Sequence, residues 1–296
     1  MRAAKGAARN LGSLYSGPMT IWFSLFFLAP IFIVIIYSFL KRGPYGGVQP
    51  EFSLDAYRYL GDPVFLNIML RTLMISLIAT IITIMIALPC GYYMAKSRYQ
   101  TFLLLLIIIP FWTNFLIRVF AWMNILGSSG FLNEFLLFIG VIDSRIQFLY
   151  NQRAVILVLV YMFLPYAILP LFSSIDKFDF SLLEAAQDLG ARKLIAMFKV
   201  LLPNIRGGIL TAVLFTFIPI FGSYAVPLLV GGRDSYMLGN VIADQLSRAR
   251  NWPRAAAISM VLTLVTTAGV LITMNIQRKD ARLIEPAIAQ NRERIK

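Results

Sequence analysis

The sequence has no histidine, a single cysteine and few charged residues, which make up 14% of the chain. Without histidine, the chain cannot form a histidine-ligated zinc site or a histidine proton relay. The single cysteine, Cys90, excludes a disulfide within the chain. The sequence also lacks a glycine-rich phosphate loop of the form G-x-x-x-x-G-K-S/T, so we expect no nucleotide or other cofactor on this chain.

Apolar residues are abundant. They make up 59% of the sequence, and the mean hydropathy is +0.75, which is too apolar for a soluble domain. A helix of about 20 uncharged residues crosses the ~30 Å hydrocarbon core of a bilayer, and it satisfies its own backbone hydrogen bonds there. Six runs of this kind predict an all-α bundle of six transmembrane helices: Thr20–Phe39, Thr72–Ala95, Tyr99–Leu126, Ala154–Ile175, Gly207–Gly232 and Ala255–Gln277.

The first apolar run follows Arg2, Lys5 and Arg9, as the core of a secretory signal peptide would. It is about 20 residues long, whereas signal cores have about 7–15, and no small-residue cleavage site follows it. We therefore expect a retained first helix and a single transmembrane domain over residues 1–296.

Lysine and arginine residues indicate the orientation of these helices. If the N-terminus is inside, the inner segments hold sixteen of the 27 Lys and Arg residues and the outer segments hold ten, with Arg118 inside a run. Because cytoplasmic loops carry the excess of Lys and Arg, both termini are expected in the cytoplasm. The basic loops also account for the pI of about 10.0, so we do not expect nucleic-acid binding.

The inner segment at residues 176–206 carries an ordered pattern. Ser181 and Glu184 have the spacing of a capping box, in which each side chain bonds to the backbone N–H of the other, and they predict the start of a short helix. Gly190 stands where a left-handed residue would end that helix. A second helix, Ala191–Leu202, is predicted to end at Pro203. Its expected apolar stripe is Leu194, Ile195, Phe198 and Leu201.

This segment resembles the EAA loop of ABC-type importer permeases, with E-A-A at 184–186, glycine at 190, a β-branched residue at 200 and L-P at 202–203. The resemblance implies a coupling helix that binds in a groove of an ATPase subunit. Two copies of that ATPase would bind ATP and Mg, and this chain would be non-catalytic. The implied coupling residues are Ser181, Glu184, Ala185, Ala186, Asp188, Gly190 and Pro203. The alternative is a helix that lies on the lipid headgroups.

Three further motifs look like those of the spermidine/putrescine (polyamine) permease group: Pro110–Trp122, Gly91–Ala95, and Gly231–Ile242 followed by Asn251-Trp252-Pro253. The resemblance covers nearly the whole chain. It implies the type I ABC importer fold in a bacterial inner membrane, a second permease subunit that is a related but different chain, and a periplasmic solute-binding protein. Polyamines are the expected cargo. Relatives of similar sequence carry thiamine, iron, phosphonates or other small amines, so another small solute is the alternative.

The third run contains the most unusual residue, Arg118. Asn114, Arg118 and Trp122 are four residues apart, so they share one helix face. Counted from Phe102, Arg118 would lie about 24 Å along a continuous helix, toward the outer side. An arginine in a span is costly unless it extends to the interface, pairs or faces water. Two interpretations stay open: interfacial placement or pairing with a neighbour such as Glu134, and a position on the translocation path.

The fifth run ends with two prolines and a glycine within Pro219–Pro227, which predicts a bent or locally unwound helix. Tyr224, in the middle of this segment, could offer an aromatic face to an amine or could simply pack at the bend. No Asp or Glu lies inside any run. A self-contained secondary transporter would be expected to carry such ligands within its spans, so that class is disfavoured.

Overall fold

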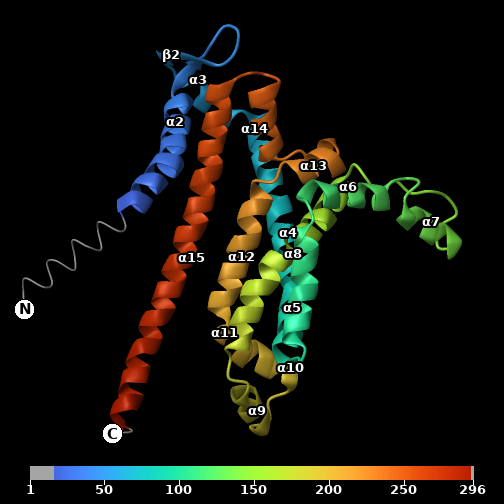
Figure 1. Cartoon of the computed structure of the whole chain (residues 1–296), viewed down its shortest axis with the longest axis vertical. Coiled ribbons are helices and arrows are strands. Elements are labelled where there is room, and N and C mark those ends of the chain that lie inside the picture. The colour runs from blue at the N-terminus through green and yellow to red at the C-terminus, as the bar shows by residue number, and fades with distance from the viewer. Residues whose placement is uncertain (1–16, 295–296) are drawn as a thin grey trace, which may run out of the picture. The chain divides into compact units, whose positions relative to one another are not determined.

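The computed structural model describes residues 17–294, with side chains described up to residue 277 (Figure 1). The basic residues Arg2, Lys5 and Arg9 lie outside this range. In the described part of the chain, five helices are long and apolar enough to cross a membrane: Gly17–Ser38, Pro63–Lys96, Phe115–Phe138, Gln152–Asp176 and Trp252–Gln277. A sixth is present if the bent pair Lys193–Asn204 and Arg206–Phe221 counts as one span. The predicted helical membrane fold is confirmed.

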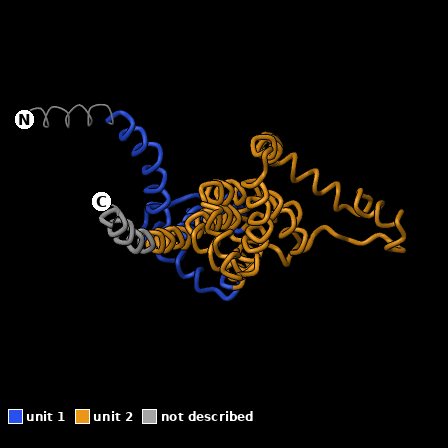
Figure 2. Tube along the Cα trace, turned by 90° about the horizontal axis from the view of Figure 1, so that it is seen from below, with its two compact units in different colours: residues 1–66, 241–263 blue, residues 67–240, 264–296 orange. Residues whose placement is uncertain are grey.

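The chain forms two compact units, which Figure 2 distinguishes by colour. Unit 1 comprises the chain up to residue 66 and residues 241–263, and unit 2 comprises the rest. Three helices begin in one unit and end in the other: α4 (Pro63–Lys96), α14 (Leu238–Ser247) and α15 (Trp252–Arg294).

Unit 1 contains the apolar first helix and a β-hairpin that the sequence did not predict. Its complete elements are η1 (Ser24–Leu28), α2 (Ala29–Ser38), β1 (Leu40–Arg42), β2 (Val48–Phe52), α3 (Asp55–Arg58) and η2 (Tyr59–Gly61). The two strands are antiparallel, with Lys41 opposite Gln49 and Arg42 opposite Val48. The Arg42 guanidinium donates to the carbonyl of Ala249 at 2.7 Å, which attaches the hairpin to the end of α14.

Unit 2 contains the larger helical bundle. Its complete elements are α5 (Gln100–Ile108), η3 (Ile109–Trp112), α6 (Phe115–Leu126), α7 (Phe131–Phe138), α8 (Gln152–Asp176), α9 (Ser181–Asp188), α10 (Lys193–Ala196), η4 (Met197–Leu201), α11 (Leu202–Asn204), α12 (Arg206–Phe221), α13 (Ala225–Val230) and η5 (Arg233–Ser235).

Helix α8 forms the centre of unit 2. It contributes buried residues to all three apolar clusters of the core, including Val158, Leu171 and Ile175. Its main partner is α12, and the two backbones approach closely where Gly208 faces Ser174. A Cβ added at Gly208 would lie 2.3 Å from the Ser174 Cβ, so only glycine fits there without displacement.

The third apolar run is two helices rather than one. The first part, Gln100–Trp112, is too short to cross the hydrocarbon core, because 13 residues span only about 20 Å. The chain becomes extended at Thr113, and the Asn114 side chain caps α6 by accepting from the Leu116 N–H at 2.8 Å. In Figure 1, α6 runs across the long axes of α5 and α8. The expected position of Arg118, about 24 Å along one continuous helix, is therefore wrong.

The fifth run breaks where its prolines and glycine predicted. Helix α12 ends at Phe221, and α13 begins at Ala225. The carbonyl of Tyr224 in this break accepts from the Asn240 amide at 3.2 Å. A Cβ at Gly239 would lie 2.5 Å from the Ser223 carbonyl oxygen, so the start of α14 packs directly against the unwound backbone.

Substitution of Gly208 should test the contact between α8 and α12. We expect Gly208→Ala to lower the free energy of unfolding by about 1–3 kcal/mol, because the added methyl group overlaps Ser174. Gly207→Ala is the matched control, since nothing lies within 4 Å of a Cβ added there. Denaturant unfolding of the purified protein in detergent measures both. Equal stabilities of the two variants would contradict this account of the contact.

Candidate functional site

The segment Ser181–Asn204, which we call the elbow, consists of two short helical arms. The first arm, α9, begins at Ser181 as predicted, but the expected capping box is not formed. Instead the Asp179 carboxylate accepts from the Ser181 N–H at 3.0 Å. The Ser181 hydroxyl also bonds to this carboxylate. This bond, the larger cause, and the bond from the Ser181 N–H both lower the pKa of Asp179 below its usual value of 3.8. The start of α9 is therefore stabilised by a carboxylate two residues upstream.

The turn between the two arms forms at Gly190, as the sequence predicted. Gly190 has a φ of +88°, in the left-handed region. Its N–H donates to the Gln187 carbonyl at 2.8 Å, and the N–H of Ala191 donates to the Ala186 carbonyl at 3.0 Å. These are the two bonds of a Schellman motif. No atom lies within 4 Å of a Cβ added at Gly190, so the requirement for glycine here comes from the backbone conformation alone.

The second arm runs from Lys193 to Asn204 and contains α10, η4 and α11. Its central turn, Met197–Leu201, is a π-helix that ends two residues before Pro203. A proline ring clashes with the carbonyl four residues earlier in a regular α-helix, and a wider turn relieves that clash. The arm therefore continues past Pro203, where it was predicted to stop. It ends at Ile205, where the axis bends by 74° into α12.

The elbow rests on the end of the bundle through a small apolar core. Leu183 of the first arm and Ala196 and Leu201 of the second are buried in one cluster with Ala95 of α4 and Ile175 of α8. Through this cluster the elbow contacts the ends of two long helices at once.

The predicted apolar stripe of the second arm is mostly exposed. Only Leu201 is buried, whereas Leu194 and Phe198 are 68% and 66% exposed. Leu189 at the turn is 89% exposed. The other exposed residues of the first arm include Ser181, Glu184, Ala185 and Asp188, and Ala186 is partly covered. Together these residues give the elbow an outer surface that combines small, acidic and apolar side chains.

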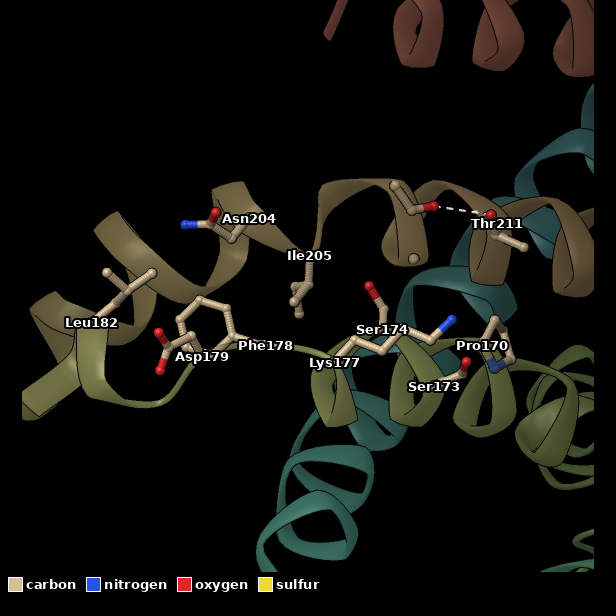
Figure 3. A pocket seen from close by; sticks show the side chains of 12 residues that line it. Pro170, Ser173, Ser174, Lys177, Phe178, Asp179, Leu182, Asn204, Ile205 and Thr211 are labelled. Atoms are coloured by element: carbon tan, nitrogen blue, oxygen red, sulfur yellow. Dashed lines mark hydrogen bonds between the residues drawn. The ribbon is translucent and has the colours of Figure 1, made fainter. Parts of the chain in front are cut away.

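A polar cavity of about 620 Å³ lies on the inner side of the 74° bend (Figure 3). Its walls come from the end of α8, the start of the elbow and the first turns of α12. Ser173, Ser174 and Lys177 line one side, and Asn204 and Thr211 line the other. The Thr211 hydroxyl donates to the Gly207 carbonyl at 2.9 Å. Polar side chains from α8, the elbow and α12 thus meet beside the bend.

Arg118 lies against an aromatic ring. Its guanidinium carbon is 4.8 Å from the centroid of the Phe111 ring, and Phe111 in turn meets Tyr166 of α8 edge-on at 5.1 Å. The Arg118 Nε is buried and has no hydrogen-bond partner among the described residues. The pairing with Glu134 is not formed, because Glu134 pairs with Arg145 at 2.7 Å.

The other three path candidates lie close to the same region. Trp122 meets Tyr161 of α8 edge-on at 5.3 Å, and Asn114 uses its side chain to cap α6. Tyr224 stands at the break before α13 and is 44% exposed. Helix α13 packs against α6, so the two segments that carry these candidates are neighbours in unit 2. Among the described residues, no group of three or more acidic or cysteine side chains could hold a metal ion.

Residues 84–280 match the profile of a family described as the binding-protein-dependent transport system inner membrane component. The chain belongs to this family. Its members are transport components of the inner membrane, so the sequence-based family assignment and the expectation of a non-catalytic, multi-pass chain are confirmed.

Similar proteins extend this assignment. The chain is 40% identical over 253 residues to the spermidine/putrescine transport system permease protein PotB of Escherichia coli K12, covering 85% of this chain and 92% of PotB. It is 38% identical to PotB of Haemophilus influenzae, covering 82% and 86% of the two chains. A bacterial ABC transporter that imports the acidic polysaccharide alginate has the same fold, with a TM-score of 0.75, 19% identity and coverage of 94% of this chain and 99% of that one.

Substitution of Gly190 should destabilise the turn of the elbow through the backbone alone. We expect Gly190→Ala to cost about 1–2 kcal/mol of local stability, because the left-handed conformation is unfavourable for a Cβ. Asparagine tolerates this conformation, so Gly190→Asn should cost less. Hydrogen exchange of the Ala191 amide, which closes the motif, measures local opening. Equal exchange in both variants would contradict the assignment.

Asp179 should titrate below the usual range of an aspartate. Its ionised form caps α9, so this contribution to stability is complete above pH 3.8 and is lost as the pH falls through the lowered pKa. The carboxyl carbon shift of Asp179 in an NMR titration measures the midpoint. Ser181→Ala removes the hydroxyl but keeps the N–H, and it should move the midpoint back toward 3.8. A midpoint at or above 3.8 in the unmodified protein would refute the cap.

Proposed function

We propose that this chain is the transmembrane permease subunit of an ATP-driven, binding-protein-dependent importer of polyamines such as spermidine and putrescine. The observation that supports polyamines as the cargo is the 40% identity to PotB, which extends over 85% of this chain and 92% of that permease. The membership of the family supports the class of transporter.

The elbow would be the part that receives the energy of ATP. ATP and Mg would bind to two copies of a separate ATPase subunit, and the outer surface of the elbow would contact that subunit. The implied contact residues are Ser181, Glu184, Ala185, Ala186, Asp188, Gly190 and Pro203. Gly190 supports this role because its turn sets the angle between the two arms. The buried cluster of Leu183 and Ala196 with α4 and α8 supports the transfer of movement from the elbow to the spans.

The path for the cargo would use aromatic faces rather than carboxylates. No acidic residue lies inside the apolar runs, and a polyamine can bind aromatic faces through cation–π interactions. Trp122 and Tyr224 offer such faces, on α6 and at the start of α13. Asn114 offers an amide. The Arg118 guanidinium already lies over the Phe111 ring in this region. Because Arg118 is positively charged, it would orient the amine rather than bind it.

The orientation and the assembly follow from the same proposal. The excess of Lys and Arg supports a cytoplasmic position for both termini and the elbow. A second permease subunit, a related but different chain, would complete the path, and a periplasmic solute-binding protein would deliver the cargo to the outer loops.

Uptake by the reconstituted complex tests this function. Proteoliposomes that contain this chain, its partner permease, the ATPase and the solute-binding protein should take up labelled spermidine or putrescine only with ATP. The solute-binding protein should bind these amines in preference to thiamine, iron or phosphonate. Uptake without the ATPase would refute the importer class, and a solute-binding protein that does not bind amines would refute the cargo.

Glu184→Lys and Gly190→Asp should uncouple the transporter. We expect normal membrane insertion but a loss of uptake per ATP hydrolysed on the order of tenfold, since both changes alter the surface that contacts the ATPase. Gly140→Asp is the matched control, because Gly140 also has a positive φ, +70°, with nothing within 4 Å of an added Cβ. Unchanged uptake in both elbow variants would remove the elbow from the mechanism.

A further inference from the structure

The motif Gly91–Ala95 at the end of α4 has a structural role that the elbow motif does not explain. A Cβ added at Gly91 would lie 3.2 Å from the Phe172 backbone nitrogen and 3.5 Å from the Leu171 Cβ, so α4 and α8 approach closely at this point. Ala95, one turn later, is buried in the cluster that also contains Ile175 and Leu183. One face of this motif therefore holds the end of α4 against α8.

The other face of the same turn carries a cation between two aromatic rings. The Lys96 ammonium lies 4.8 Å from the centroid of the Phe180 ring and 5.5 Å from that of Tyr92. The two rings meet edge-on, with their centroids 6.1 Å apart. The Lys96 ammonium makes no hydrogen bond or ion pair to another described residue. Its position in the last turn of α4 also places the positive charge at the negative end of the helix dipole.

Phe180 connects this cation to the first arm of the elbow. Its backbone carbonyl accepts from the N–H groups of Leu183 at 3.0 Å and Glu184 at 3.3 Å, so Phe180 forms part of the first turn of α9. Its ring packs edge-on against Phe178 at 5.5 Å. The same residue thus belongs to α9 by its backbone and contacts α4 by its side chain.

We propose that Lys96 is a positioning residue that holds the start of α9 against the end of α4, so that a displacement of the elbow moves α4 with it. This inference rests on the proposed function, because it concerns how the elbow transmits force. The attraction of an ammonium to ring faces requires its charge. An arginine at position 96 should preserve the contact, and a methionine, which keeps an apolar stem of similar length, should not.

The first experiment measures the contact itself in the purified full-length protein. We expect Lys96→Met to speed hydrogen exchange of the Leu183 and Glu184 amides about fivefold, because the cation–π contribution of an exposed pair is lost. Lys96→Arg should exchange within about twofold of the unmodified protein. Exchange in α8 should be unchanged in both variants, which shows that they fold. Equal exchange of α9 in Lys96→Met and the unmodified protein would overturn the proposal.

The second experiment measures coupling in the complete transporter with its ATPase and solute-binding protein. We expect Lys96→Met to lower spermidine uptake per ATP hydrolysed about fivefold, with ATP hydrolysis retained, and Lys96→Arg to restore it. Arg98→Met is the matched control. Arg98 lies two residues beyond the end of α4, over the ring of Tyr99 at 4.6 Å, so its loss should leave coupling unchanged.

Four results separate failure of this inference from failure of the proposed function. The positioning role is overturned if Lys96→Met takes up a normal amount of spermidine per ATP hydrolysed. It is also overturned if uptake per ATP in Lys96→Arg is as low as in Lys96→Met. In both cases ATP-driven uptake by the unmodified complex stands. An equal loss in Arg98→Met also overturns it, because the effect would then be one of charge near the membrane. ATP-independent uptake by the unmodified complex would instead refute the proposed function.

Discussion

Backbone groups within a bilayer have no water to bond, so each break in a membrane helix needs a partner from the protein itself. The breaks in this chain meet that requirement in different ways. At Asn114 a side chain caps the new helix from within the same segment. At Tyr224 the carbonyl is bonded by Asn240, sixteen residues later. Gly190 lies in none of the candidate spans, and there the backbone bonds itself. Because each break has such a partner, the segments between long helices can have a definite shape.

That shape is what makes the elbow suited to transmit movement. Its two arms are fixed to each other by the Schellman bonds at Gly190 and to the bundle by the cluster around Leu183 and Ile175. Phe180 adds a contact to α4 through Lys96. A segment attached at several points to long helices transfers displacement to them, whereas a flexible loop would absorb it. The outer surface, with Leu189 and Phe198 exposed, is left available for contact.

Much of this could be predicted from the sequence, because it depends on local rules. The apolar runs predicted the helices, Gly190 predicted the turn, and the prolines near Tyr224 predicted the break. The rest depends on local geometry that no motif indicates and on contacts between distant residues. Asp179 replaces the expected capping box through a bond between neighbours, and the bend at Ile205 follows a π turn that no periodicity indicates. The contact of Lys96 with Phe180 joins residues 84 positions apart in the sequence. The break at Thr113 was missed because the apolar run continues on both sides of it.

The bend at Ile205 has a geometric consequence. The second arm has twelve residues, from Lys193 to Asn204, and is therefore about 18 Å long. A pivot of about 10° at Ile205 would carry its far tip through about 3 Å. Adding one helical turn to the arm would lengthen the distance that its tip moves by nearly a third. The distance that the tip moves for a given rotation is thus set by the number of residues in the arm. An insertion or deletion in this arm would change that distance without altering any of the proposed contact residues.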